Sequence, residues 1–490
     1  MTKALICVAV PLLVLWLPVN QVLQGIEVVQ VRMLAIFTLA VLCWVLEPIP
    51  IFATSVLLIG LELLLISDKG PIWFRDPSRI EEMGKLLPYQ DILSTFASPI
   101  IMLFLGGFFL AMAATKYHLD VNLARVFLRP FGESPKFVML GMMVITAVFS
   151  MFMSNTATTA LMITIVTPVL RLFPNDDLGR TALVLCIPLA ANIGGIGTPI
   201  GSPPNAVAMK YLVGEQAISF GGWMTFGVPF SISLLAIAWI LLVTLLPSKK
   251  ERIKLIIESE FRRTPRAWVV YICFALTILL WLTGSLHGMN SYVVAMIPVA
   301  VFLVSGVIGK QDLKNLSWDV LWLISGGIAL GLGLESTGLS HTLVANIPFA
   351  ELSPLVIVVM ATVMGLLMST FISNTATANL LLPIMATLGA TVSTLGEIGG
   401  SKLLVLLVTF SCSLAMALPV STPPNAMAYA TGLLANRQLL QIGALISGIG
   451  LVLLICWQCC FGKLDSSNIY PSCACQSSVD AVFRVFKKDL

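Results

Sequence analysis

The chain has 490 residues, of which 58% are hydrophobic and only 11% are charged, and its mean hydropathy is +0.97. A soluble domain carries about 25% charged residues, so this composition excludes an ordinary soluble protein. The net charge of +4 is small and the basic residues are clustered, so we expect no nucleic-acid partner. The composition predicts an all-α polytopic membrane protein embedded in a lipid bilayer.

Apolar runs that approach the thickness of a hydrocarbon core, about 30 Å, recur along the whole chain. They are residues 4–23, 34–47, 51–66, 137–153, 224–246, 269–282, 292–307, 355–372 and 439–457. Apolar and polar residues do not alternate with a period of two over any long stretch, which argues against a β-barrel. The first run is followed by "WLPVNQVL" and not by a small-residue cleavage site, so we interpret it as a retained helix.

The segment "SKKERIKLIIESEFRRTPR", residues 248–266, holds seven Lys or Arg and three Glu near the middle of the chain. Basic loops lie preferentially on the cytoplasmic side of a membrane. We therefore expect this linker and the N-terminus to be cytoplasmic, in a cell (inner) membrane. Five of the ten Cys follow residue 455, and residues 462–490 differ in composition from the rest, as an atypical Cys-containing tail.

Three landmarks occur twice, once on each side of the basic linker. The glycine pair in "LFLGGFFLAMA" recurs in "LISGGIALGLG" (327 − 107 = 220), "SNTAT" recurs unchanged (373 − 154 = 219), and "GSPPNAVA" recurs as "STPPNAMA" (423 − 203 = 220). A constant offset over about 100 residues indicates a duplicated unit. We favour an inverted orientation of the second copy. The predicted division is 1–97 and 267–318 for scaffold helices, 98–247 and 319–461 for the two repeat cores, 248–266 for the linker and 462–490 for the tail.

Each "SNTAT" places a polar triplet inside an apolar run, first at Ser154, Asn155 and Thr156 and again at 373–375. Ser, Asn and Thr compete for backbone hydrogen bonds and favour turns and helix N-caps. The triplets therefore predict the tips of two helical hairpins. The second helix of each hairpin starts at its tip, where N-terminal amides attract anions.

A packing role is the alternative for a single triplet, since small polar residues are common where membrane helices touch. Packing alone does not require the triplet to recur intact. Ser150 and Ser369 each lie one helical turn before a triplet, on the same helix face. Their pairing makes them further candidates for the site.

Each half also contains a break, "GIGTPIGSPPN" at 195–205 and "MALPVSTPPN" at 416–425. Gly and consecutive Pro interrupt helical hydrogen bonding, and irregular backbone at membrane depth must be satisfied by protein or by a polar cavity. Freed carbonyls, hydroxyls and amides are the oxygen ligands that hard cations prefer. The Pro-Pro-Asn triplets could also act only as helix breakers.

No charged residue occurs between Arg180 and Lys210, between Glu351 and Glu397, or from 403 to 436. A site built from these motifs is therefore expected to contain no fixed charge. An anion bound there would need cations bound beside it. A proton-coupled carrier more often has an acid or a histidine inside the membrane, so we expect sodium coupling.

Two SNT tips, each followed by a broken helix with Pro-Pro-Asn, resemble the divalent anion/sodium symporter family, and bacterial sodium-dependent dicarboxylate transporters in particular. The resemblance covers residues from about 30 to 460 and leaves out the tail. It implies two inverted repeats with about eleven transmembrane helices, two re-entrant hairpins and broken helices. It also implies a homodimer that moves sodium and a C4-dicarboxylate (succinate, malate or fumarate) by an elevator movement.

The resemblance also implies functional residues. Those for the substrate are Ser154, Asn155, Thr156, Ser202, Ser373, Asn374, Thr375, Thr422 and Pro423. Those for sodium are Ser150, Ser154, Asn155, Gly201, Ser369, Ile372, Asn374 and Ser421. The family pattern leads us to expect a smaller residue at Ser421, where the carbonyl would be the ligand. Sodium is carried as a co-substrate, and no catalytic residue is expected.

Alternatives remain open from the residues themselves. Within the same class, sulfate or citrate could replace the dicarboxylate. An anion channel would show uptake without sodium dependence. An intramembrane serine hydrolase would need a base beside its nucleophile, and the three histidines, His118, His287 and His341, lie away from the motifs.

Overall fold

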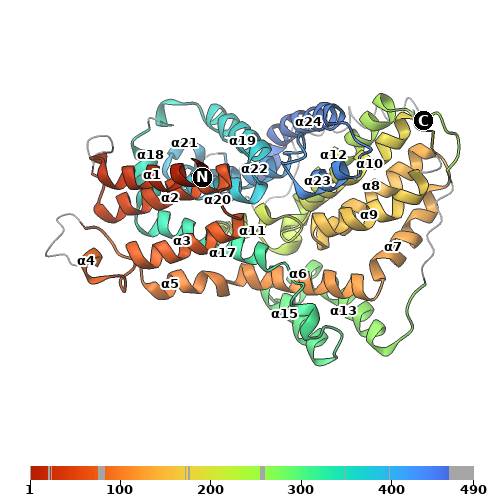
Figure 1. The fold of residues 1–490 in the computed structure, drawn as a ribbon, viewed down its shortest axis with the longest axis horizontal. Helices are drawn as coiled ribbons and strands as arrows, with labels where there is room; N and C mark the ends of the chain where they lie inside the picture. The colour runs from red at the N-terminus through yellow and green to blue at the C-terminus, as the bar shows by residue number, and fades with distance from the viewer. Residues whose placement is uncertain are drawn as a thin grey trace.

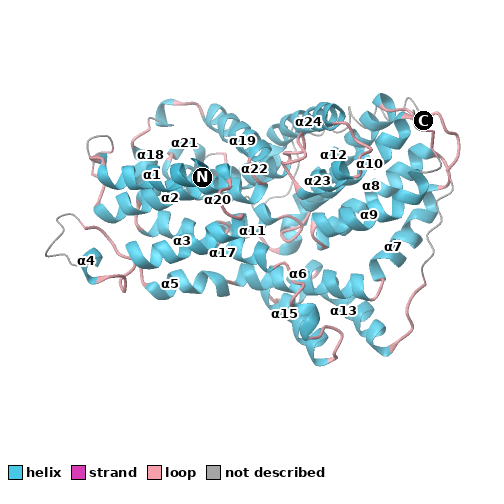
Figure 2. Ribbon diagram, viewed as in Figure 1, coloured by secondary structure: helices cyan, strands magenta, loops and turns pink. Residues whose placement is uncertain are grey.

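The computed structural model describes residues 2–19, 23, 25–75, 83–170, 173–174, 177–253, 260–347, 349–396 and 398–462. The Cys-containing tail beyond residue 462 lies outside these ranges. Helices joined by turns make up the described chain (Figure 2), and its only β feature is an isolated bridge between Ser67 and Leu87. The prediction of an all-helical polytopic protein is confirmed.

The longer helices are α1 (Thr2–Trp16), α2 (Val28–Leu46), α3 (Ile51–Leu65), α6 (Pro99–Lys116), α7 (Leu119–Leu128), α8 (Pro135–Phe152), α9 (Asn155–Leu170), α10 (Leu178–Gly195), α12 (Phe220–Leu245), α13 (Pro265–Leu282), α15 (Ser291–Val304), α17 (Trp318–Ser336), α19 (Pro354–Phe371), α20 (Asn374–Thr391), α22 (Gly400–Ser413), α23 (Pro423–Ala430) and α24 (Asn436–Gly462). The shorter ones are α4 (Ile72–Arg75), α5 (Tyr89–Ser94), α11 (Pro203–Met209), α14 (Gly284–His287), α16 (Lys310–Leu313), α18 (Leu339–Ala345) and α21 (Ser393–Gly396).

Nine helical segments in the described part of the chain are long and apolar enough to cross a membrane. Two of them, α8 and α19, are the first arms of hairpins, and α1, α3 and α15 fall below the length limit with 15, 15 and 14 residues. Helix length alone therefore does not give the number of crossings, and the eleven expected helices stay a prediction.

The duplicated landmarks lie on corresponding elements. The glycine pairs lie in α6 and α17, the hairpins are α8–α9 and α19–α20, and the broken helices are α10–α11 and α22–α23. Figure 1 shows the two hairpins in opposite halves of the view, with α11 and α23 between them. Each short helix after a break packs against the other half: α11 against α20 and α22, and α23 against α9 and α10. The two copies are therefore interlocked at the centre of the protein.

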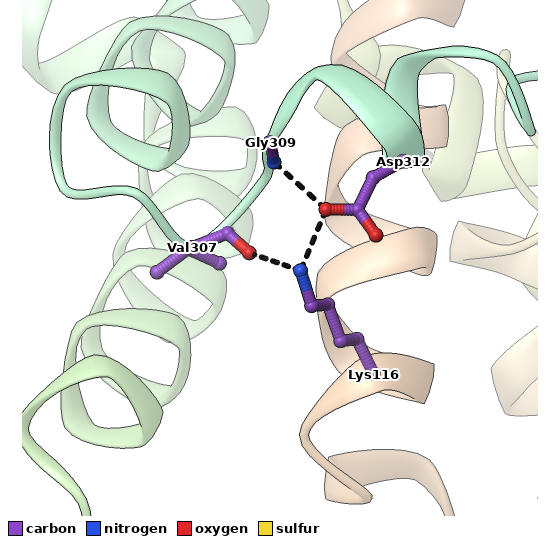
Figure 3. Close-up of polar contacts among 4 residues, drawn as sticks. All are labelled: Lys116, Val307, Gly309 and Asp312. Atoms are coloured by element: carbon purple, nitrogen blue, oxygen red, sulfur yellow. Dashed lines mark hydrogen bonds and ion pairs between the residues drawn. The ribbon is translucent and has the colours of Figure 1, made fainter.

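Polar contacts tie the end of α6 to α16 and to the turn that precedes it (Figure 3). Lys116 Nζ donates to Asp312 Oδ2 (2.6 Å) and to the Val307 carbonyl (2.9 Å), and the Gly309 N–H donates to the same carboxylate oxygen (2.7 Å). The Gly309 N–H and the Lys116 ammonium hold the pKa of the Asp312 carboxyl below its usual range. The charged carboxylate thus joins two elements that are far apart in sequence.

Asp312→Asn should lower the unfolding temperature in detergent slightly, because a partly exposed ion pair contributes about 0–1 kcal/mol. The pKa is lowered in the folded state, so the stabilisation is present at neutral pH and is lost as the pH falls through the lowered value, below about pH 4. The difference between wild type and variant should therefore disappear in acid. Lys314→Met, at an exposed position nearby, is the control. A difference that is unchanged in acid would contradict this account.

Candidate functional site

Both predicted hairpin tips are present. In the first half α8 ends at Phe152 and α9 begins at Asn155, and in the second half α19 ends at Phe371 and α20 begins at Asn374. The backbone between the arms is extended, and the serine of each triplet then starts the next helix. Its hydroxyl accepts the amide three residues on, at 3.2 Å in both halves. The SNT triplets therefore fold as N-caps, as their residue types require.

The asparagine that follows each serine is held by the helix before the tip. Ser150 donates to Asn155 Oδ1 and lies 2.7 Å from the Ala191 carbonyl. Ser369 lies 2.8 Å from Asn374 Oδ1. Both serines are fully buried.

Ser369 is also 2.8 Å from the Cys412 carbonyl, so each serine faces two acceptors. A hydroxyl has one proton, and so one acceptor in each half is left without it. Three neutral oxygens converge at each tip in an arrangement that suits a small hard cation. Among the described residues, no cluster of three or more His, Cys, Asp or Glu offers a charged alternative.

The two breaks are closed by the asparagines of the Pro-Pro-Asn triplets. Asn205 Nδ2 donates to the carbonyls of Gly195 (2.9 Å) and Thr198 (2.8 Å). Asn425 Nδ2 donates in the same way to the carbonyls of Met416 (2.8 Å) and Leu418 (3.0 Å). Both asparagines are fully buried. Their role is to satisfy carbonyls that the broken helices leave free, so these triplets do more than interrupt a helix.

The residue at Ser421 differs from the expected pattern for a structural reason. Its hydroxyl donates to the Thr370 carbonyl at 2.7 Å and so ties the break to the hairpin. In the first half the corresponding residue is Gly201, and the tie is made by Thr198, which donates to the Met151 carbonyl. A side chain at Gly201 has no room, since a Cβ there would lie 2.6 Å from the Gly195 carbonyl oxygen.

Side chains also link the two halves across the centre. Asn192 Nδ2 lies 3.1 Å from Thr422 Oγ1 and 3.2 Å from Asn425 Oδ1. At the related position, the hydroxyls of Ser202 and Ser413 are 3.4 Å apart. The helix before each break is therefore linked to the start of the short helix in the other half, α10 to α23 and α22 to α11.

A cavity of about 610 Å³ is lined by both tips and both breaks. All nine residues predicted for the substrate line it: Ser154, Asn155, Thr156, Ser202, Ser373, Asn374, Thr375, Thr422 and Pro423. Gly201 and Ser421 also line it. Ser150 and Ser369 lie behind the tips, and Ile372 is a buried, extended residue of the second tip.

The cavity contains residues that the motifs did not reveal. Asn192 is one, and aromatic side chains of α3 and α6 are others: Phe52, Phe104 and Phe108. Asn192 is a polar residue inside the apolar sequence "CIPLAANIGG", which is the only signal that could have found it.

The expectation of a site without fixed charge is wrong at the cavity edge. Asp319, in the first turn of α17, lines the cavity and is exposed. It was missed because it is 54 residues before the second triplet (373 − 319 = 54) and has no acidic counterpart in the first half. The tips and breaks themselves remain uncharged.

Comparison with known proteins identifies relatives over most of the chain. The family described as the sodium:sulfate symporter transmembrane region matches residues 1–464. The sodium-dependent dicarboxylate transporter SdcS of Staphylococcus saprophyticus is 31% identical over 451 residues, 84% of this chain and 82% of that protein. SdcS of Staphylococcus aureus (strain NCTC 8325) is 30% identical over 450 residues, with the same coverage. These matches confirm the predicted resemblance.

Among solved structures, the YdaH transporter of Alcanivorax borkumensis is similar with a TM-score of 0.56 at 13% identity, over 88% of this chain and 98% of that one. At this identity the likeness concerns the fold alone.

Asn205→Leu and Asn425→Leu should each lower the unfolding temperature strongly. Each change leaves two buried carbonyls without a donor, at about 1–3 kcal/mol per group. Thermal unfolding of the purified protein measures this, with Asn315→Leu at an exposed loop position as the control. Variants as stable as the control would show that the breaks do not depend on these amides.

Proposed function

We propose that this chain, which belongs to the sodium:sulfate symporter family, carries C4-dicarboxylates such as succinate, malate or fumarate together with sodium ions. Family membership makes it a multi-pass, sodium-coupled anion symporter and not an enzyme. The dicarboxylate is our choice among anions. It is supported by the similarity to two SdcS proteins, whose sequences are 31% and 30% identical to this chain.

The observation that carries this choice is the duplication of the donor set around one cavity. Each tip offers an N-capping serine, an asparagine and the first amides of a helix. Two equivalent donor sets suit an anion with two carboxylate ends, one at each tip. Sulfate has one anionic centre and citrate has three carboxylates, so neither matches the pairing as well.

In this proposal the residues divide into two groups. Asn155, Asn374 and the neighbouring triplet hydroxyls, with Ser202 and Thr422 at the breaks, hold the carboxylates. Sodium ions bind where the Ser150 and Ser369 hydroxyls meet the asparagine oxygens, with further carbonyls from the breaks. The bound cations then compensate the dianion in a cavity whose tips carry no charge.

The movement that we propose follows from how the helices pack. The hairpins and broken helices contact one another extensively, as α8 with α10 and α20 with α22, and α12 packs against both α10 and α24. We infer that they form one mobile unit and that α1–α3, α13 and α15 form a scaffold, in a homodimer with an elevator movement. We add α17 to the scaffold because it packs along α3, whereas the predicted division placed residues 319–461 in a repeat core. The inverted repeats, about eleven crossings, an inner-membrane location and a cytoplasmic N-terminus and linker complete the proposal.

Reconstitution in liposomes tests the proposal. Radiolabelled succinate should enter with an inward sodium gradient and not when potassium replaces sodium. Asn155→Ala and Asn374→Ala should each reduce uptake about tenfold or more, because each removes hydrogen bonds to a charged group. Asn315→Ala, at an exposed position, should leave uptake unchanged.

Each other result has a definite meaning. Sodium-independent uptake would indicate a channel and contradict symport. Sodium-dependent uptake of sulfate or citrate, without succinate, would contradict the dicarboxylate and leave the symporter in place. Uptake that survives in both asparagine variants would remove the tips from the site.

Asp319 should weaken the binding of anions in proportion to their charge. The Coulomb energy is proportional to the product of the charges and is about 0.4 kcal/mol per unit charge at 10 Å in water. Asp319→Asn should therefore lower the inhibition constant of a competing carboxylate by about twofold for each negative charge that the competitor carries. The change should be smallest for a monocarboxylate and largest for a tricarboxylate. The difference should shrink at high salt.

The inhibition constants of the three competitors, at fixed sodium, measure this dependence. Ser317→Ala, at an uncharged lining position, is the matched control. An equal shift for all three competitors would show that Asp319 acts through shape and not through its charge.

A further inference from the structure

The two copies of the SNTAT motif differ in what covers them. Ala157, in the first copy, is exposed and lines the cavity. Ala376, the same residue of the second copy, has no exposed surface and shares a core cluster with Ala329 and Leu330 of α17. α20 packs along α17, whereas no comparable packing joins α9 to α6 within the described residues. In this conformation α20 is therefore covered and α9 is open.

The helix α6 is the counterpart of α17 in the first half. The glycine pairs lie in these two helices at an offset of 327 − 107 = 220, and α6 packs on α15 as α17 packs on α3. We therefore place α6 with α17 in the scaffold. This inference rests on the proposed movement, in which the mobile unit exchanges its contact with α17 for a contact with α6. After that exchange α9 is covered and α20 is open, because the two units are duplicates.

A buried asparagine of α20 lies against the bare backbone of α17. Asn379 has no exposed surface, and a Cβ on Gly327 would collide with its Oδ1. Its Nδ2 donates to the Leu323 carbonyl at 3.3 Å, which is longer than the usual range of about 2.7–3.2 Å. Its Oδ1 has no hydrogen-bond partner among the described residues. The amide is thus held weakly at one end and unsatisfied at the other.

A tyrosine meets the same face of α17 one helical turn further on. Tyr211 lies just after α11, and a Cβ on Gly331 would collide with its hydroxyl oxygen. Gly331 is four residues after Gly327, so both glycines lie on one side of the helix. The Tyr211 hydroxyl is buried and has no partner in the described part of the chain. Two unsatisfied polar atoms of the mobile unit therefore face one stripe of α17.

The first half lacks these unsatisfied groups at the corresponding positions. Ala160 corresponds to Asn379 (379 − 160 = 219) and lines the cavity. Thr431 corresponds to Tyr211 (431 − 211 = 220), and its hydroxyl donates to the Ala428 carbonyl at 2.7 Å. When α9 covers α6, an alanine is buried where α20 now buries an asparagine. When α20 leaves α17, Asn379 comes to face an open cavity, as Ala160 does now.

The unsatisfied atoms make the contact with α17 easier to open. A buried donor or acceptor without a partner has lost its hydration and gained nothing in return. Water completes the hydrogen bonds of Asn379 once α20 is uncovered. Lys210 acts in the opposite direction, because its Nζ donates to the Ile328 carbonyl of α17 at 2.7 Å. The contact is thus held at one place and opposed at two.

We propose that Asn379 and Tyr211 are release residues, which favour the conformation in which α20 and α11 have left α17. The two ends of the movement are then unequal. Leaving α17 relieves two unsatisfied polar groups, and leaving α6 relieves no counterpart of either. A mobile unit without ligands therefore spends more of its time away from α17 than it would with apolar side chains at these two positions.

Cysteine labelling tests the proposal without requiring transport. Ala376→Cys is covered by α17, so the rate of its reaction with a water-soluble maleimide follows the population of the conformation in which this contact is open. Asn379→Leu and Tyr211→Phe keep the shape of the side chain and remove the unsatisfied group. Each should lower the rate about fivefold or more. Ala160→Asn, which buries an asparagine against α6, should lower it as well.

Two controls separate a change of conformation from a change of overall stability. Labelling of the buried Cys412 in the same protein should be equally slow in every variant. Asn315→Leu, at an exposed position, should leave the rate at Ala376→Cys unchanged. A parallel fall at Cys412 would overturn the proposal, since the variants would then act on overall stability.

The remaining outcomes are also decisive. Unchanged or faster labelling of Ala376→Cys in Asn379→Leu and Tyr211→Phe would overturn the release role. No labelling of Ala376→Cys in any variant would show that the contact does not open, and no fall in Ala160→Asn would overturn the exchange of α17 for α6. Absence of sodium-driven succinate uptake by wild type would instead count against the proposed function, while the labelling rates would still decide the release role.

Discussion

The structure depends on one constraint, which is that irregular backbone in an apolar interior must find its hydrogen-bond partners inside the protein. Two breaks and two tips leave amides and carbonyls that no helix satisfies. Asn205 and Asn425 each donate to two of these carbonyls, and the serine of each tip accepts the amide of the third residue of α9 or α20. The polar motifs are thus first of all the means by which a membrane helix can be interrupted.

The same constraint creates the binding chemistry. Once Ser150 and Ser369 are placed to hold the asparagines, each faces two carbonyl oxygens with one proton. The oxygen left without a donor can be satisfied by a cation, and the amides at the tip can be satisfied by an anion. In the proposed function, cation and anion then stabilise each other in the same cavity, and in this way tips and breaks without charge hold a dianion.

The duplicated motifs made much of this predictable from sequence. Their residue types predicted both tips and both breaks, and every substrate residue that the family resemblance implies lines the cavity. Asn192 and Asp319 could not be found this way, because the residue at the Asn192 position of the second half is Ser413 and Asp319 has no counterpart. The number of membrane crossings could not be predicted from helix length and hydropathy either, because hairpin arms and spanning helices have similar values of both.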